Sequence, residues 1–179
     1  MPEARVVIPL AIFFVMGAAL LWMLWRVVVA GGRARRETAS GAAAAEIARR
    51  TEALLADLLL VVDEMRRRKL SPGDAEPSMA AARGTLQRYG QEATALSRGG
   101  AWATTAAALV EDIERAERAI DLVAHGRELL ADLSGHDWGE GETSVKRGYL
   151  NLVHAREAIR QRREMIVLAG QAGRSGWDA

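Results

Sequence analysis

A long uncharged apolar stretch near the amino terminus constrains this chain more than any other feature. The segment Val6 to Trp25, VVIPLAIFFVMGAALLWMLW, contains 20 residues without a charge or a side-chain amide. A helix of that length spans about 30 Å, which matches the hydrocarbon thickness of a bilayer. Residues 1–30 are therefore predicted to form a transmembrane anchor, and the rest of the chain is expected to be a polar helical body attached to it.

Two other interpretations of the stretch remain open. A cleaved signal peptide has an apolar region of about 7–15 residues followed by small residues, and Val28-Val29-Ala30 could act as its cleavage site. Against this hypothesis, the apolar run observed here is longer. A buried core helix is the second alternative, although core helices seldom remain uncharged over such a length.

The residues that follow the stretch predict how it would lie in a membrane. The predicted membrane-interface residues are Trp22, Trp25, Arg26, Arg33, Arg35 and Arg36. Tryptophan favours the headgroup level, and cytoplasmic flanks are enriched in lysine and arginine. We therefore predict a single-pass protein of the cell membrane with its amino terminus outside and a cytoplasmic body. Membrane lipids are predicted partners, because juxtamembrane arginines attract anionic headgroups.

The composition beyond the stretch predicts an all-α body. Alanine, leucine, glutamate and arginine dominate, and all four are strong helix formers. The chain has no cysteine, which excludes disulfides and thiolate metal sites. Beyond Arg36 there are 19 basic and 22 acidic residues, a net charge of −3, so no nucleic-acid binding is expected.

Apolar residues at alternating spacings of three and four predict four amphipathic helices after the anchor. The apolar residues that are predicted to face the core along one helix are called the seam of that helix. We expect an antiparallel, up-down-up-down four-helix bundle. Residues 31–45 are predicted to be a juxtamembrane linker, 46–169 the cytosolic bundle and 170–179 a disordered tail. The predicted seams are Ile47, Thr51, Leu54, Leu58, Val61 and Met65; Met79, Ala82, Leu86, Tyr89, Ala93 and Leu96; Leu109, Ile113, Ala116, Ile120, Val123 and Leu130; and Val145, Tyr149, Leu152, Ile159 and Ile166. The alternative is a coiled coil between chains, which would form a homo-oligomer.

Two arginines interrupt the seams of the last two predicted helices. Arg127 and Arg156 fall on seam positions, where an unpaired charge is rarely buried. They are expected to snorkel outward, to pair with a carboxylate, or to bind an anionic partner. Each lies within a His-x-x-Glu sequence, at 125–128 and 154–157. Di-metal bundles use the reverse order, Glu-x-x-His, and these histidines fall on outward positions, so no metal or cofactor is predicted.

The loop between the last two predicted helices contains an exposed aromatic candidate. Trp138 lies between Asp137 and Glu140 in a glycine-rich acidic stretch whose spacing matches neither a calcium loop nor a zinc motif. Tryptophan is enriched at protein-binding hot spots. The predicted partner-binding residues are therefore Trp138, Asp137, Glu140, Arg127 and Arg156. The alternative is that Trp138 folds back onto the end of the bundle, because large aromatic residues are mostly buried.

No sequence motif specifies a reaction. The chain has no Gly-x-Ser-x-Gly, no Walker A loop and no dinucleotide fingerprint, so it is not expected to be an enzyme. We expect a single-pass, membrane-anchored helical interaction protein that acts as a scaffold, assembly factor or accessory subunit of a membrane complex. Its predicted partners are other membrane or cytosolic proteins. The alternatives are a membrane-anchored signal-transducing bundle and a phage or envelope accessory protein.

Overall fold

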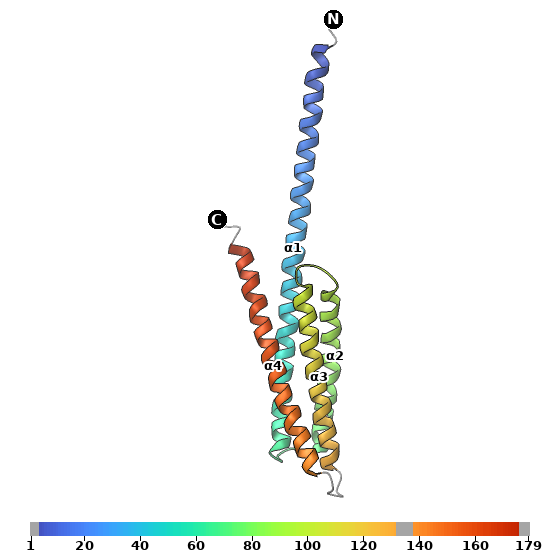
Figure 1. Cartoon of the computed structure of the whole chain (residues 1–179), viewed down its shortest axis with the longest axis vertical. Helices are drawn as coiled ribbons and strands as arrows, with labels where there is room; N and C mark the ends of the chain where they lie inside the picture. Colours follow the sequence, from blue (N-terminus) through green and yellow to red (C-terminus); the bar gives the residue numbers. More distant parts are fainter. Residues whose placement is uncertain (1–3, 132–137, 176–179) are drawn as a thin grey trace. The chain divides into compact units, whose positions relative to one another are not determined.

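The described part of the chain is entirely helical apart from its turns. The computed structural model describes the backbone of residues 4–131 and 138–175 and the side chains of 20–26, 32, 37–131 and 138–172. Four helices follow one another: α1 (Ala4–Arg66), α2 (Pro72–Ser97), α3 (Ala103–Ala131) and α4 (Trp138–Ser175) (Figure 1). No strand occurs within these ranges, so the predicted all-α class is confirmed.

The chain divides into two units, residues 1–39 and 40–179, and α1 contributes to both. The region 31–45, predicted to be a linker, is helical and belongs to α1. Helix α4 continues past residue 169, the predicted end of the bundle, to Ser175. Residues 176–179 of the predicted tail lie outside the described part of the chain.

The predicted single-pass membrane localisation is contradicted. Within the described residues, no helix is both long and apolar enough to cross a bilayer. Residues 6–19 of the predicted span lie outside the described side chains. The predicted orientation, with an outside amino terminus and a cytoplasmic body, depended on that membrane span and therefore has no support.

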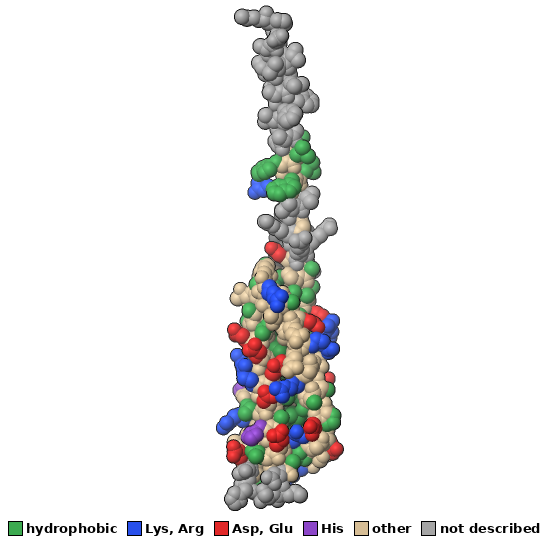
Figure 2. Space-filling model, turned by 90° about the vertical axis from the view of Figure 1, so that its right-hand side faces the viewer, with side chains coloured by type: hydrophobic (Ala, Val, Ile, Leu, Met, Phe, Trp, Pro, Cys, Tyr) green, Lys and Arg blue, Asp and Glu red, His purple; other side chains and the backbone are tan. Residues whose placement is uncertain are grey.

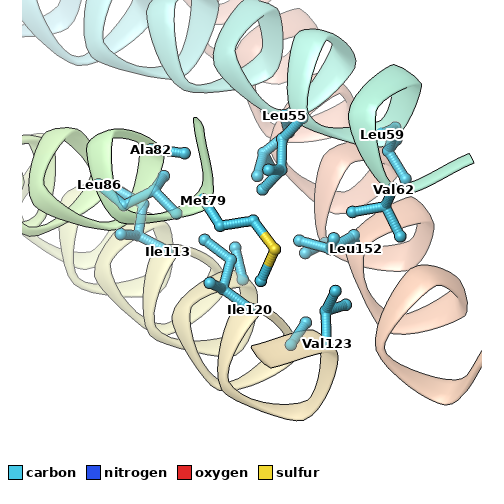
Figure 3. Packing of buried hydrophobic residues seen from close by; sticks show 14 of the residues in the cluster. Leu55, Leu59, Val62, Met79, Ala82, Leu86, Ile113, Ile120, Val123 and Leu152 are labelled. Carbon is cyan, nitrogen blue, oxygen red and sulfur yellow. The ribbon is translucent and has the colours of Figure 1, made fainter. Parts of the chain in front are cut away.

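Residues 40–179 form a helical bundle around one apolar core. Successive helices run in opposite directions, and α3 packs against both α2 and α4 (Figure 1). Figure 3 shows side chains from all four helices meeting at the centre, with Leu55 of α1, Met79 of α2, Ile120 of α3 and Leu152 of α4 pointing toward one another. Burial of these apolar side chains is the main stabilising term of such a bundle.

Opposite charges are interspersed on the outside of the bundle (Figure 2). Arg83 of α2 pairs with Asp121 of α3 at 3.0 Å, for example, and both side chains are about half exposed. Exposed pairs of this kind each contribute only about 0–1 kcal/mol to stability. The surface ion pairs therefore add little to stability, and the apolar core stabilises the packing of the helices.

The predicted seams of α2 and α3 match the buried residues. In α2 the buried members are Met79, Ala82, Leu86 and Ala93. In α3 they are Leu109, Ile113, Ala116, Ile120 and Val123. The three/four repeat of apolar residues is uninterrupted in α2, and in α3 it is interrupted at Arg127, where the neighbouring Gly126 is buried instead. Elsewhere in both helices the pattern alone determines which face is buried.

In α1 and α4 some of the buried residues are direct neighbours in the sequence of the residues that were predicted to be in the seam. In α1, Leu55 and Val62 are fully buried, whereas the predicted Leu54 and Val61 are only half-buried. Both members of each pair are apolar, so the sequence does not distinguish them.

In α4 the residues that are buried are smaller than the residues that were predicted to be buried. Gly148 and Ala155 are buried, whereas the predicted Tyr149 is half-buried and Arg156 is exposed. The prediction that Arg156 occupies a seam position is therefore wrong. Small residues lie on this face because it meets α3 at close range.

Helices α3 and α4 approach each other through glycine and alanine at heptad spacing. A Cβ atom added to Gly126 would lie 2.7 Å from the carbonyl oxygen of Gly141 and 2.8 Å from the amide nitrogen of Val145. A Cβ added to Gly148 would lie 2.9 Å from the carbonyl oxygen of Ala119. Because the obstructing atoms belong to the backbone, no side-chain rotation relieves these contacts. Close packing of α3 against α4 therefore requires glycine at both positions.

Replacing Gly126 by alanine tests this close approach. The Gly126→Ala change should lower the free energy of unfolding by about 1–3 kcal/mol, because overpacking displaces the backbone of α4. The matched control is Gly84→Ala in α2, where nothing lies within 4 Å of the added Cβ. That control should raise stability by about 1 kcal/mol through helix propensity. Urea unfolding of the full chain, followed by circular dichroism, measures both; a stabilised Gly126→Ala variant would contradict the packing.

The observed register of α1 makes a second prediction. Leu55 is fully buried, so Leu55→Ala should cost about 2–5 kcal/mol of unfolding free energy. Leu60 is 67% exposed, and Leu60→Ala should change stability by less than about 0.5 kcal/mol. The same unfolding assay compares the two variants, and equal effects would show that the register is wrong.

Candidate functional site

A pocket of about 500 Å³ lies at one end of the bundle, where α1 ends and α4 begins. It is lined by Met65, Arg66, Arg68, Leu70, Ser71, Pro72, Leu130, Trp138, Glu142, Val145 and Lys146. The apolar members are mostly buried or half-buried and form its floor, while the four charged members are exposed and form its rim. This is the lower end of the bundle in Figure 1. Its volume falls in the range of about 300–1,000 Å³ that is typical of binding pockets.

The turn after α1 brings Arg68 to this pocket. The amide of Lys69 donates to the carbonyl of Glu64 at 2.9 Å, and the amide of Arg68 donates to the carbonyl of Met65 at 3.0 Å. These two bonds define a Schellman motif, which satisfies the last carbonyls of a helix. The residue at its left-handed position is Arg68, with φ of 57°, where glycine is usual. Backbone strain of this kind concentrates at functional sites.

Arg68 connects this turn to the first turns of α4. Its guanidinium carbon lies 4.7 Å from the centre of the Trp138 ring, and its Nη2 donates to the Oε1 of Glu142 at 3.2 Å. A second cation–π contact, between α1 and α4, places Arg66 at 4.5 Å over the ring of Tyr149. Exposed cation–π contacts contribute about 0.5–1 kcal/mol each, so each of these two contacts adds modestly to the packing of α1 and its following turn against α4.

Trp138 is the one predicted partner-binding residue that lines the pocket. It begins α4 and keeps 39% of its surface exposed while one face carries Arg68. Glu140 is exposed in the first turn of α4 but does not line the pocket. Asp137 lies outside the described residues.

The two predicted arginine sites have different surroundings. Arg127 is only 15% exposed, and its Nη1 donates to the Oε2 of Glu76 at 2.7 Å, so it pairs with a carboxylate of α2. Arg156 is exposed on α4, away from the pocket lining. The structure therefore does not bring these two arginines together with Trp138 in one site.

The predicted membrane-interface residues belong to the first unit. Trp22, Trp25 and Arg26 are exposed, and the guanidinium of Arg26 lies 5.4 Å from the centre of the Trp22 ring. The side chains of Arg33, Arg35 and Arg36 lie outside the described residues. These residues are not part of the pocket.

The two histidine sequences do not form a metal site in the part of the chain that is described. His125 and His154 are both exposed, on the outward positions that the seams predict. No group of three or more histidine, aspartate or glutamate side chains that could hold a metal ion occurs among the described residues.

Sequence reasoning predicted none of the four charged rim residues, Arg66, Arg68, Glu142 and Lys146, as site residues. The run from Arg66 to Lys69 is explained by the helix dipole alone, so it gives no local sign of a site. One signal was available: the chain has only two lysines, Lys69 and Lys146, and both lie at this end of the bundle. Their proximity depends on the fold, because they belong to elements far apart in the chain.

The chain matches no protein-family model, no curated protein and no solved structure. Its function is therefore inferred from the chemistry of the pocket.

The left-handed backbone at Arg68 makes a testable prediction. Arg68→Gly and Arg68→Ala both remove the contacts with Trp138 and Glu142, but only glycine relieves the strained φ. The Arg68→Gly variant should therefore be more stable than Arg68→Ala by about 1 kcal/mol. Urea unfolding of the two variants measures the difference, and equal stabilities would show that this residue is not left-handed in solution.

Proposed function

We propose that this chain is a helical interaction protein, a scaffold, assembly factor or accessory subunit of a protein complex, which binds its partner at the pocket end of the bundle. The observation that supports this proposal is the half-exposed Trp138, which lies at the edge of an apolar pocket with an arginine stacked on it. Tryptophan and arginine are among the residues most enriched at binding hot spots, especially beside pockets that exclude water.

The frame of the pocket supports binding to a preformed surface. Its residues come from the end of α1, the following turn, the end of α3 and the start of α4. The Schellman turn and the close packing of Gly126 on Gly141 hold these segments. A rigid site loses little conformational entropy when a partner binds, which favours affinity.

Among the described residues, Ser71 supplies the one hydroxyl of the pocket lining, and this hydroxyl has a structural role. The Oγ of Ser71 accepts from the amide of Asp74 at 3.1 Å and so caps the start of α2, and it donates to the carboxylate of Asp74 at 2.6 Å. The described lining therefore offers mainly apolar and charged side chains to a partner, which supports a binding role.

Co-purification with a matched control tests this proposal. The full chain, tagged and expressed in its source cells, is compared with Trp138→Ala and with Leu168→Ala, which removes an exposed leucine far along α4. A hot-spot truncation costs about 2 kcal/mol or more, so at least one co-purifying protein should fall on the order of thirty-fold with Trp138→Ala. The same protein should remain with Leu168→Ala. Quantitative mass spectrometry measures both.

Thermal melts of both variants verify that each is folded. We expect Trp138→Ala to fold, because Trp138 is already partly exposed. If the two variants retain the same proteins in the same amounts as the unchanged chain, the pocket end is not the binding surface and the proposal is wrong.

A further inference from the structure

We propose that the pocket end recognises an acidic segment of a partner protein. An apolar side chain of that segment enters the pocket, and a neighbouring carboxylate binds Lys146 and Arg68 at its rim. This inference rests on the proposed function and names the chemistry of the partner.

The charges of the lining favour an acidic partner. Among the described residues, three cations and one carboxylate line the pocket: Arg66, Arg68, Lys146 and Glu142. Two of the cations already have partners, since Arg68 pairs with Glu142 at 3.2 Å and Arg66 pairs with Asp63 at 3.6 Å. Lys146 forms no ion pair with any residue in the described part of the chain. It is the cation most available to a carboxylate from outside.

Two further exposed cations are adjacent in the sequence to lining residues. Lys69 precedes the lining residue Leu70, and Arg147 follows Lys146. The exposed carboxylates Glu64 and Glu140 are also outside the lining. An extended peptide segment can contact cations outside the lining as well as the pocket itself, whereas a small anion that fills the pocket contacts the lining alone. These flanking cations therefore favour a peptide over a small anion.

The floor of the pocket suits an apolar anchor next to the carboxylate. Met65 and Val145 are buried at its base, and Leu70, Leu130 and Trp138 complete the apolar walls. Desolvated pockets that accept one anchoring side chain supply most of the binding energy in such interfaces. The charged rim then adds specificity and faster association.

A carboxylate of the partner can replace Glu142 as the hydrogen-bond acceptor of Arg68. Both side chains are mostly exposed, so this ion pair contributes only about 0–1 kcal/mol. A carboxylate of the partner can therefore replace Glu142 beside Arg68 at little cost. The cation–π contact with Trp138, at 4.7 Å, does not involve Glu142 and still holds the guanidinium of Arg68 beside the pocket.

Selection of random heptapeptides displayed on phage tests this inference. The unchanged full chain should enrich peptides in which aspartate or glutamate lies next to leucine, isoleucine, phenylalanine or tryptophan. The best peptide is then synthesised, and its Kd is measured by fluorescence anisotropy against Lys146→Glu and Arg98→Glu. Arg98 is an exposed arginine at the opposite end of α2 and serves as the matched charge-reversal control.

Lys146→Glu should weaken binding about tenfold or more, because it places a like charge against the peptide, whereas Arg98→Glu should change the Kd by less than about twofold. The absence of any enrichment, the enrichment of neutral or basic peptides, or equal binding by Lys146→Glu would each overturn the inference.

The alternative partner at the pocket is a second copy of this chain. Sedimentation velocity of the same proteins tests this alternative. Self-association that Trp138→Ala and Lys146→Glu abolish would also overturn the acidic-segment proposal. If peptide selection fails while Trp138→Ala still loses its co-purifying protein, only the chemistry of the partner is wrong. If both fail, the proposed function is wrong as well.

Discussion

The close approach of α3 and α4 is the constraint on which the rest of the bundle depends. Between Gly126 and Gly141 there is no room for a Cβ atom, and the same holds between Gly148 and Ala119. This contact places the first turns of α4 against the end of α3, with Val145 and Leu130 beside the two glycines. Because both of these apolar residues also line the pocket, the site depends directly on the packing of this helix pair.

Ion pairs between helices add a second constraint on how they align. Asp112 of α3 is buried and accepts from Arg162 of α4 and from Arg115, each at 2.8 Å. Arg163 of α4 reaches Glu52 of α1 at 2.8 Å. A buried pair contributes little net stability, but breaking it leaves a charge without a partner. Any sliding of α4 along its neighbours would separate these charges, so the pairs disfavour other registers of α4.

The sequence by itself determined the fold class and much of its outline. Strong helix formers and a three/four apolar repeat led to an all-α bundle, and the seams of α2 and α3 agree with the buried residues. Proline, glycine and serine near residues 71–74 and 97–100 are typical of breaks between helices, although α2 already begins at Pro72. The uncharged stretch from Val6 to Trp25 led instead to a membrane span that the described residues contradict. Hydropathy alone was not a sufficient basis for that localisation.

Only the tertiary structure decided the register of α1 and α4 and the composition of the pocket. Adjacent residues differ by about 100° around a helix, so a broad apolar face such as Leu54-Leu55 fits two registers equally well. In α4, Gly148 and Ala155 are buried because α3 packs closely against this face. The local sequence pattern does not predict that close packing. For the same reason the sequence singled out Trp138 but not Arg68 or Lys146. Side chains from distant segments become one site only when the packing of the helices brings them to the same end.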